Sequence, residues 1–181
     1  MNKLFDPTAF ENIKVVIEGA VYDRDLQGEI LVTDRDDLVN LAKLSRKYSV
    51  SFQMRHDVEG KIQAALTIEA GLGNLAAELL DGEGSLHLAG CAVTALFLLK
   101  HQHEEELYSK VQQALERIWG AGRTITQSAT LNPLQSGMSV KNEAAVHFNR
   151  LVLEDQIDDL AEMVDYMIAS MRELELSIGK G

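Results

Sequence analysis

The chain has 181 residues, of which 46% are apolar and 25% are charged, a size and composition typical of one folded domain with a sizeable core. Its 28 Asp and Glu residues outnumber its 17 Lys and Arg residues, and the resulting formal charge of -11 argues against nucleic acid and membranes as partners. The single cysteine, Cys91, cannot form an internal disulfide. Since we find neither a signal-peptide pattern nor an apolar run long enough to span a membrane, we expect a cytoplasmic protein.

The first half of the chain alternates between strand-like and helix-like patterns. Residues 12–22 are rich in β-branched side chains and predict a first strand, and residues 29–33 predict a second. Thr33, with Asp36 three residues later, resembles a helix capping box, and the apolar residues that follow have helical spacing. We therefore expect a helix over residues 34–47.

The same order of elements then recurs. Residues 49–55 and 61–69 alternate apolar and polar side chains on either side of a glycine-containing turn at residues 57–60. This pattern predicts a β-hairpin, with a left-handed glycine in the turn. Residues 72–80 predict a short helix after it.

A third, weaker unit follows. Residues 85–99 fit either a second hairpin or one strand that leads into a buried helix, whereas residues 103–119 clearly predict a helix that ends at a glycine. Three ββα units predict an α+β fold, in which an antiparallel sheet of about four to six strands has helices on one face. Residues 1–120 would form this core, and the polar residues 121–142 predict a flexible connection. An edge strand over residues 123–131 is the alternative.

Residues 143–181 predict a long amphipathic helix. Its apolar residues are spaced alternately four and three apart, a heptad pattern that suits packing against another helix. This apolar seam consists of Leu153, Ile157, Leu160, Val164, Met167, Met171, Leu174 and Ile178. The helix also carries an acidic face, which consists of Asp155, Asp158, Asp159, Glu162 and Asp165. The sequence leaves open whether the seam packs within one chain or between chains.

Motifs that carry chemistry are few. Residues 71–76 (GLGNLA) fit the G-x-G-x-x-A pattern of dinucleotide sites. However, they follow a hairpin strand, and the acidic residue that such sites need after the next strand is missing. We therefore expect these glycines to form a turn. His101 and His103 lack the spacing that places two metal ligands on one helical face. Cys91 lies among apolar residues, which favours a buried thiol over a nucleophile. The acidic face lacks the loop carbonyls that a calcium site normally recruits. We therefore predict no catalytic, cofactor or metal site.

These features favour a non-catalytic protein-binding or oligomerisation module, such as an adaptor, a regulator or a chaperone-like protein. We expect its C-terminal helix to bind a protein partner or a second copy, so that the chain forms a homo-oligomer. One alternative is a small-molecule-binding domain or enzyme with a pocket between the sheet and the helices. Another is an acidic inhibitor or immunity-type protein that binds a basic partner.

Overall fold

A computed structural model describes residues 8–79, 85–135, 137 and 139–179. The elements, in chain order, are α1 (Thr8–Leu26), β1 (Ile30–Asn40), β2 (Ser45–Met54), β3 (Ile62–Ala70), α2 (Leu72–Leu79), the short 3-10 helix η2 (Leu86–Leu88), β4 (Gly90–Gln102), α3 (Glu105–Trp119), β5 (Thr124–Thr130), β6 (Ser139–Leu153), the 3-10 helix η3 (Glu154–Gln156) and α4 (Ile157–Ile178). The strands form one open sheet in the order β1-β2-β3-β4-β6-β5, and every neighbouring pair is antiparallel. The expected α+β class, with an antiparallel sheet and a long C-terminal helix, is confirmed.

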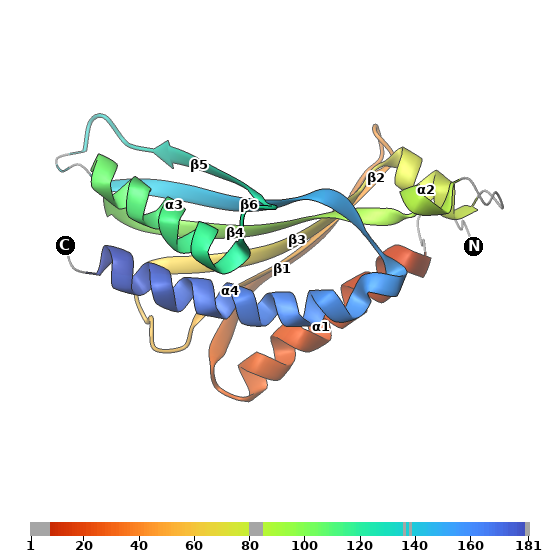
Figure 1. Cartoon of the computed structure of the whole chain (residues 1–181), viewed down its shortest axis with the longest axis horizontal. Coiled ribbons are helices and arrows are strands. Elements are labelled where there is room, and N and C mark those ends of the chain that lie inside the picture. Colours follow the sequence, from red (N-terminus) through yellow and green to blue (C-terminus); the bar gives the residue numbers. More distant parts are fainter. Residues whose placement is uncertain (1–7, 80–84, 136, 138, 180–181) are drawn as a thin grey trace.

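The helices lie mainly on one face of the sheet. Figure 1 shows α1, α3 and α4 on this side and α2 near one end of the sheet, with α4 running alongside α1. The core fills the space between them, as one cross-strand row illustrates: Val50, Leu66, Ala95 and Val146 lie opposite one another on β2, β3, β4 and β6, and all four are 0% exposed. We call the opposite face, which none of the described helices covers, the outer face.

The segment predicted as the first strand is the helix α1, so that prediction is wrong. Phe10, Ile13, Ile17 and Val21 are spaced three and four residues apart and are buried against the sheet. A helix places such positions on one stripe, and burial of that stripe outweighs the modest strand preference of Val and Ile.

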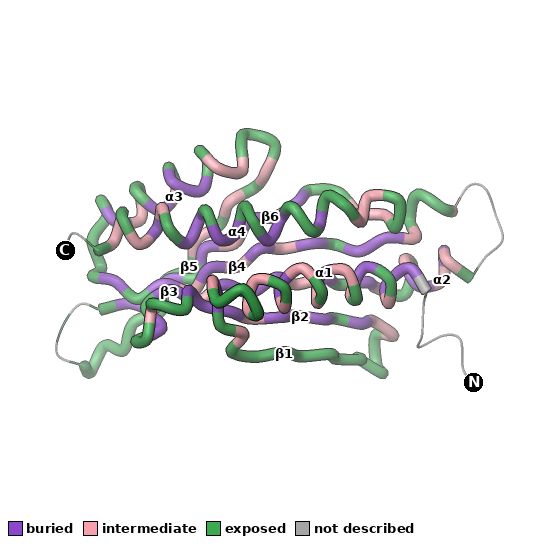
Figure 2. The backbone as a smooth tube through the Cα atoms, turned by 90° about the horizontal axis from the view of Figure 1, so that it is seen from below, coloured by how far each residue is buried: buried purple, intermediate pink, exposed green. Residues whose placement is uncertain are grey.

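The helix predicted over residues 34–47 is also wrong, because this segment forms the β1–β2 hairpin. Leu38 and Leu41, which gave the helical spacing, are 54% and 73% exposed, and Figure 2 shows β1 as largely exposed. Pairing with β2 decides the conformation, and the hairpin turn contains Leu44 at a positive φ of 51°. Asp37 of β1 accepts hydrogen bonds from Arg46 of β2 and from Lys14 of α1, which fix the edge strand to its neighbours.

The middle part of the chain agrees better with the sequence. The β2–β3 hairpin is confirmed, and Gly60 in its turn has a φ of 59°. The helices α2 and α3 are confirmed as well, with Gly120 directly after the last residue of α3. Residue 80, the expected end of α2, lies outside the described residues. Residues 85–99 match neither alternative, since η2 leads into the single strand β4.

The last third was predicted least well. The expected flexible connection over residues 121–142 contains β5, which was the alternative, and the first residues of β6; residues 136 and 138 lie outside the described part. The C-terminal helix begins only at Ile157, because residues 139–153 form β6 and their buried side chains alternate as in a strand. No helix in the described ranges is long and apolar enough to cross a membrane.

Candidate functional site

The apolar seam packs within the chain. Five of its residues are 0% exposed and lie in the core formed by the sheet and the helices: Leu160, Val164, Met167, Met171 and Leu174. Ile157 and Ile178 are partly buried against the same core, and Leu153 is the last residue of β6. The seam is therefore occupied by the protein's own residues.

The acidic face lies at the surface, where all five of its residues are exposed. Asp165 forms an ion pair with Arg24 of α1, a partner that the local sequence could not indicate. Among the described residues, the other four have no ion pair within 4.0 Å. Two of them, Asp159 and Glu162, line a pocket.

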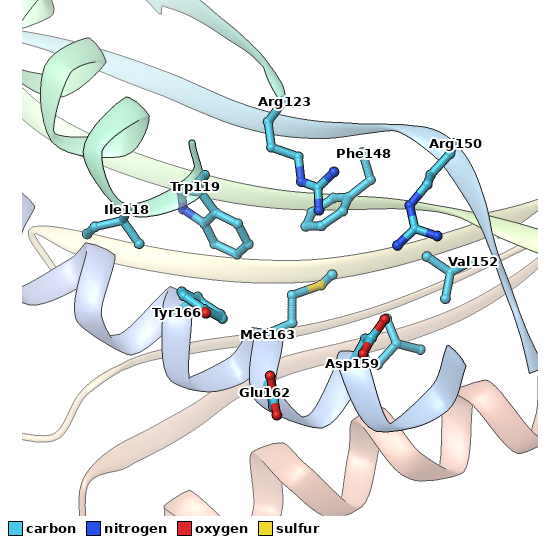
Figure 3. A pocket seen from close by; sticks show the side chains of 11 residues that line it. Ile118, Trp119, Arg123, Phe148, Arg150, Val152, Asp159, Glu162, Met163 and Tyr166 are labelled. Atoms are coloured by element: carbon cyan, nitrogen blue, oxygen red, sulfur yellow. The ribbon is translucent and has the colours of Figure 1, made fainter. Parts of the chain in front are cut away.

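This pocket lies between the end of α3, the strand β6 and the first half of α4 (Figure 3). It has a volume of about 250 Å3 and is open to solvent on one side. Its lining combines apolar, aromatic and charged side chains: Ile118, Trp119, Arg123, Phe148, Arg150, Val152, Asp159, Leu160, Glu162, Met163 and Tyr166. The helix predicted to bind a partner thus contributes to this site through residues beside its seam and through the seam residue Leu160.

Three aromatic rings form one side of the pocket. The ring centroid of Trp119 lies 5.6 Å from that of Phe148, with the planes at 90°, and 5.7 Å from that of Tyr166, with the planes at 41°. The indole Nε1 of Trp119 donates a hydrogen bond of 2.9 Å to Oγ of Ser170, which in turn donates to the carbonyl oxygen of Tyr166. Since Ser170 is 0% exposed, this buried bond fixes the indole against α4.

Two arginines line the strand side of the pocket. The guanidinium carbon of Arg123, in the turn before β5, lies 4.1 Å from the ring centroid of Phe148, a cation–π geometry. The Nε atom of Arg123 is buried and has no hydrogen-bond partner in the structure. Arg150, on β6, is exposed.

The two pocket arginines differ from the rest in their electrostatic partners. Six other arginines form ion pairs with Asp or Glu: Arg24, Arg35, Arg46, Arg55, Arg117 and Arg172. In the described part of the chain, neither Arg123 nor Arg150 has such a pair within 4.0 Å. In a chain of charge -11, unpaired arginines are unexpected, and both lie in the same pocket.

The remaining sequence candidates have structural roles. The strand before residues 71–76 pairs antiparallel on both sides, so the parallel unit of a dinucleotide site is missing there. Instead, Oδ1 of Asn74 accepts a hydrogen bond of 3.0 Å from the backbone nitrogen of Gly71 and closes the strand-to-helix turn. Cys91 is 1% exposed, and burial raises the pKa of its thiol to about 12.

The two neighbouring histidines do not converge on one point. His101 is buried, with Nδ1 2.7 Å from the carbonyl oxygen of Gln102 and Nε2 3.1 Å from Nδ2 of Asn142. His103 is exposed, and its Nδ1 lies 2.8 Å from the hydroxyl of Tyr108. Over the residues that the structure describes, no group of three His, Cys, Asp or Glu side chains could hold a metal ion.

Comparison with known proteins adds no assignment: no protein-family model, no curated protein and no solved structure matches the chain. The site must therefore be interpreted from its own chemistry.

A pocket between the sheet and the helices was an alternative prediction, but the sequence did not predict which residues line it. These residues come from α3, the following turn, β6 and α4, and only Asp159, Leu160 and Glu162 belong to the predicted seam or acidic face. One signal was available, namely that Trp119 is the single tryptophan of the chain and follows the apolar stripe of a predicted helix. That signal gives no indication of which strand faces the indole.

Proposed function

We propose that this chain is a non-catalytic binding protein that holds a small organic ligand in the pocket between β6, α3 and α4. The observation that carries the proposal is that Arg123 and Arg150 line the pocket without an acidic partner within 4.0 Å among the residues that the structure describes. A ligand carboxylate that accepts hydrogen bonds from the terminal nitrogens of these guanidinium groups would gain charge-assisted contacts.

The composition of the pocket supports recognition rather than chemistry. Ligand sites are typically concave and mostly apolar, with a few polar groups that fix orientation, and this lining follows that pattern. Its described residues include no Ser, Cys or His that could act as an activated nucleophile or as a base that titrates near neutral pH. A cytoplasmic location, expected from the composition, remains part of the proposal.

A thermal-shift screen of small organic acids, amines and amino acids tests this function. A ligand present at about 100 times its Kd stabilises the native state by about 2.7 kcal/mol, which raises the Tm of a protein of this size by about 5 to 10 °C. Trp119 provides an independent readout because it is the single tryptophan and lines the pocket. A true pocket ligand should change its fluorescence.

Two arginine variants make the screen specific. Arg150→Ala removes an exposed, unpaired pocket charge, so it should keep the fold and lose most of the thermal shift. Arg172→Ala is the matched control, since Arg172 is also an exposed arginine but pairs with Glu29 away from the pocket. A screen without hits, or hits that stabilise wild type and Arg150→Ala equally, would contradict the proposed function.

Self-association is a second candidate, and a different surface favours it. Two copies of a chain with a charge of -11 repel each other unless they meet at a neutral surface. The outer face offers one, because from β2 to β5 its two central cross-strand rows carry no formal charge when His147 is neutral: Ser49, Thr67, Thr94, His147 and Thr124 form one row, and Ser51, Ala65, Leu96, Ala145 and Thr126 form the other. Acidic residues, Asp36 and Asp34, follow only where these rows reach the edge strand β1. We propose a second copy of this chain as the partner that covers these rows.

Light scattering tests this second candidate directly. Leu96→Glu places a charge in the middle of the neutral rows and should reduce the mass of a dimer to that of a monomer. Leu134→Glu, at a side chain that is 94% exposed in the β5–β6 connection, should leave the mass unchanged. A wild-type protein that is monomeric at all concentrations would exclude the outer face as an interface.

A further inference from the structure

The charges of the pocket are arranged on two opposing walls. Arg123 and Arg150 extend from the strand side, whereas Asp159 and Glu162 lie on α4 (Figure 3). Within the described chain, none of the four forms an ion pair within 4.0 Å. The lining is therefore neutral in sum and polarised from one wall to the other.

This polarity selects the charge of the ligand. A simple anion would be attracted by the arginines but repelled by the carboxylates of α4, and a simple cation would meet the reverse. A molecule with one charge of each sign is attracted by both walls, provided that its charges are close enough to fit a small pocket. The arrangement thus favours a zwitterion over a singly charged ligand.

The aromatic side of the pocket selects the rest of the ligand. The face of Phe148 is already covered by Arg123, so the rings that remain for a ligand are those of Trp119 and Tyr166. Their planes are tilted by 41°, and a flat ring laid against this pair can meet one ring face-on and the other at its edge. The thioether of Met163, which lies beside them, is a favourable contact for an aromatic ring.

Size limits the ligand further. Pockets for drug-sized molecules span about 300 to 1,000 Å3. This pocket, at about 250 Å3, suits a ligand below that range. On the basis of the binding function above, we propose that the ligand is an aromatic α-amino acid or a close chemical relative. Its carboxylate is held by Arg123 and Arg150, its ammonium group faces the carboxylates of α4, and its ring lies against Trp119.

Four compounds test this ligand class, with Trp119 fluorescence and titration calorimetry as readouts. L-phenylalanine carries all three recognised groups, 3-phenylpropionate lacks the ammonium, 2-phenylethylamine lacks the carboxylate, and L-alanine lacks the ring. L-phenylalanine should bind, and each of the other three should bind about tenfold or more weakly, because each lacks one of the three recognised groups. N-acetyl-L-phenylalaninamide, which resembles a residue inside a peptide, should also fail, and this distinguishes a free amino acid from a peptide segment.

Two charge-neutralising variants then assign the walls. Arg150→Gln should raise the Kd of L-phenylalanine about tenfold and should bring it close to the Kd of 2-phenylethylamine. Glu162→Gln should instead remove the preference for L-phenylalanine over 3-phenylpropionate. Both side chains are exposed, and neither variant should unfold the protein, which circular dichroism verifies.

The outcomes separate this inference from the proposed function. Equal binding of L-phenylalanine and 3-phenylpropionate would overturn the zwitterion while leaving a binding pocket. Equal binding of L-phenylalanine and L-alanine would overturn the aromatic part. If no compound alters Trp119 fluorescence up to about 10 mM, the ligand class is wrong. In that case the broader screen described above still decides whether the pocket binds any ligand.

Discussion

Replacing Met167 with alanine should destabilise the protein without changing its oligomeric mass. Met167 lies at the centre of the apolar seam and is 0% exposed inside the chain's own core. Truncation of a buried methionine to alanine costs about 2 to 5 kcal/mol. We expect the lower half of this range, because the neighbouring residues Met163 and Met171 are flexible and can partly fill the cavity. For a chain of this length, the corresponding decrease in Tm is about 5 to 15 °C.

The assay is urea denaturation followed by circular dichroism, combined with light scattering. Leu176→Ala is the matched control on the same helix, since Leu176 is 66% exposed and its truncation should change the free energy of unfolding by less than about 0.5 kcal/mol. If Met167→Ala changed the oligomeric mass and left the unfolding of the monomer unaffected, the seam would join two chains. The intramolecular packing argued above would then be refuted.

Three further predictions concern the fold. Gly90→Ala should cost about 1 to 3 kcal/mol in thermal or urea unfolding, because the added Cβ would lie 2.6 Å from a backbone carbonyl oxygen of β6; Gly73→Ala, with nothing within 4 Å of its Cβ, is the control that should not destabilise. Burial raises the pKa of the Cys91 thiol to about 12, so a thiol reagent at pH 8 should react with it only as fast as the protein opens. Rapid labelling of the native state would contradict this and would show that the thiol is accessible. The hydrogen bond from Arg46 lowers the pKa of the Asp37 carboxyl group. The stability that this pair contributes is therefore present at neutral pH. It is lost at pH values below about 4, as the pH falls through the pKa that Asp37 has in the folded state. Because solvent screens the exposed Asp37 carboxylate, Asp37→Asn should cost only about 0.5 to 1 kcal/mol at pH 7, and it should flatten the acid limb of stability against pH. An unchanged acid limb would assign the loss to other carboxylates.

The sequence was sufficient for elements whose own periodicity is unambiguous. Alternation around the turn at Gly60 predicts the β2–β3 hairpin, and a regular stripe with a terminal glycine predicts α3. It failed where local preference and tertiary pairing disagree. In α1 the β-branched residues belong to a helix because the apolar stripe from Phe10 to Val21 is buried against the sheet. In β1 the apolar residues have helical spacing, but pairing with β2 makes the segment a strand.

The residues that line the pocket could not be predicted for a different physical reason. Trp119 meets Phe148 only because β4 and β6 pair antiparallel and return the chain past the end of α3. That no ion pair forms at Arg123 or Arg150 among the described residues is also a property of the three-dimensional arrangement, since no composition rule states which arginines remain unpaired. Charge counting indicates an acidic protein, whereas the distinctive feature of the site is its two unpaired cations.

The helix α4 combines stability and recognition on adjacent stripes. The seam runs through Leu160, Val164 and Met167 and is buried, so its substitution affects folding. Asp159, Glu162, Met163 and Tyr166 are spaced at i, i+3, i+4 and i+7, which places them on a second stripe beside the seam, and this stripe faces the pocket. Because the two stripes share one rigid helix, the seam fixes the position of the pocket residues, and of its members only Leu160 also lines the described pocket. Substitution of exposed residues of the second stripe, such as Glu162, should therefore change ligand preference at little cost in stability. A helix used mainly as an oligomerisation seam would not separate these two effects.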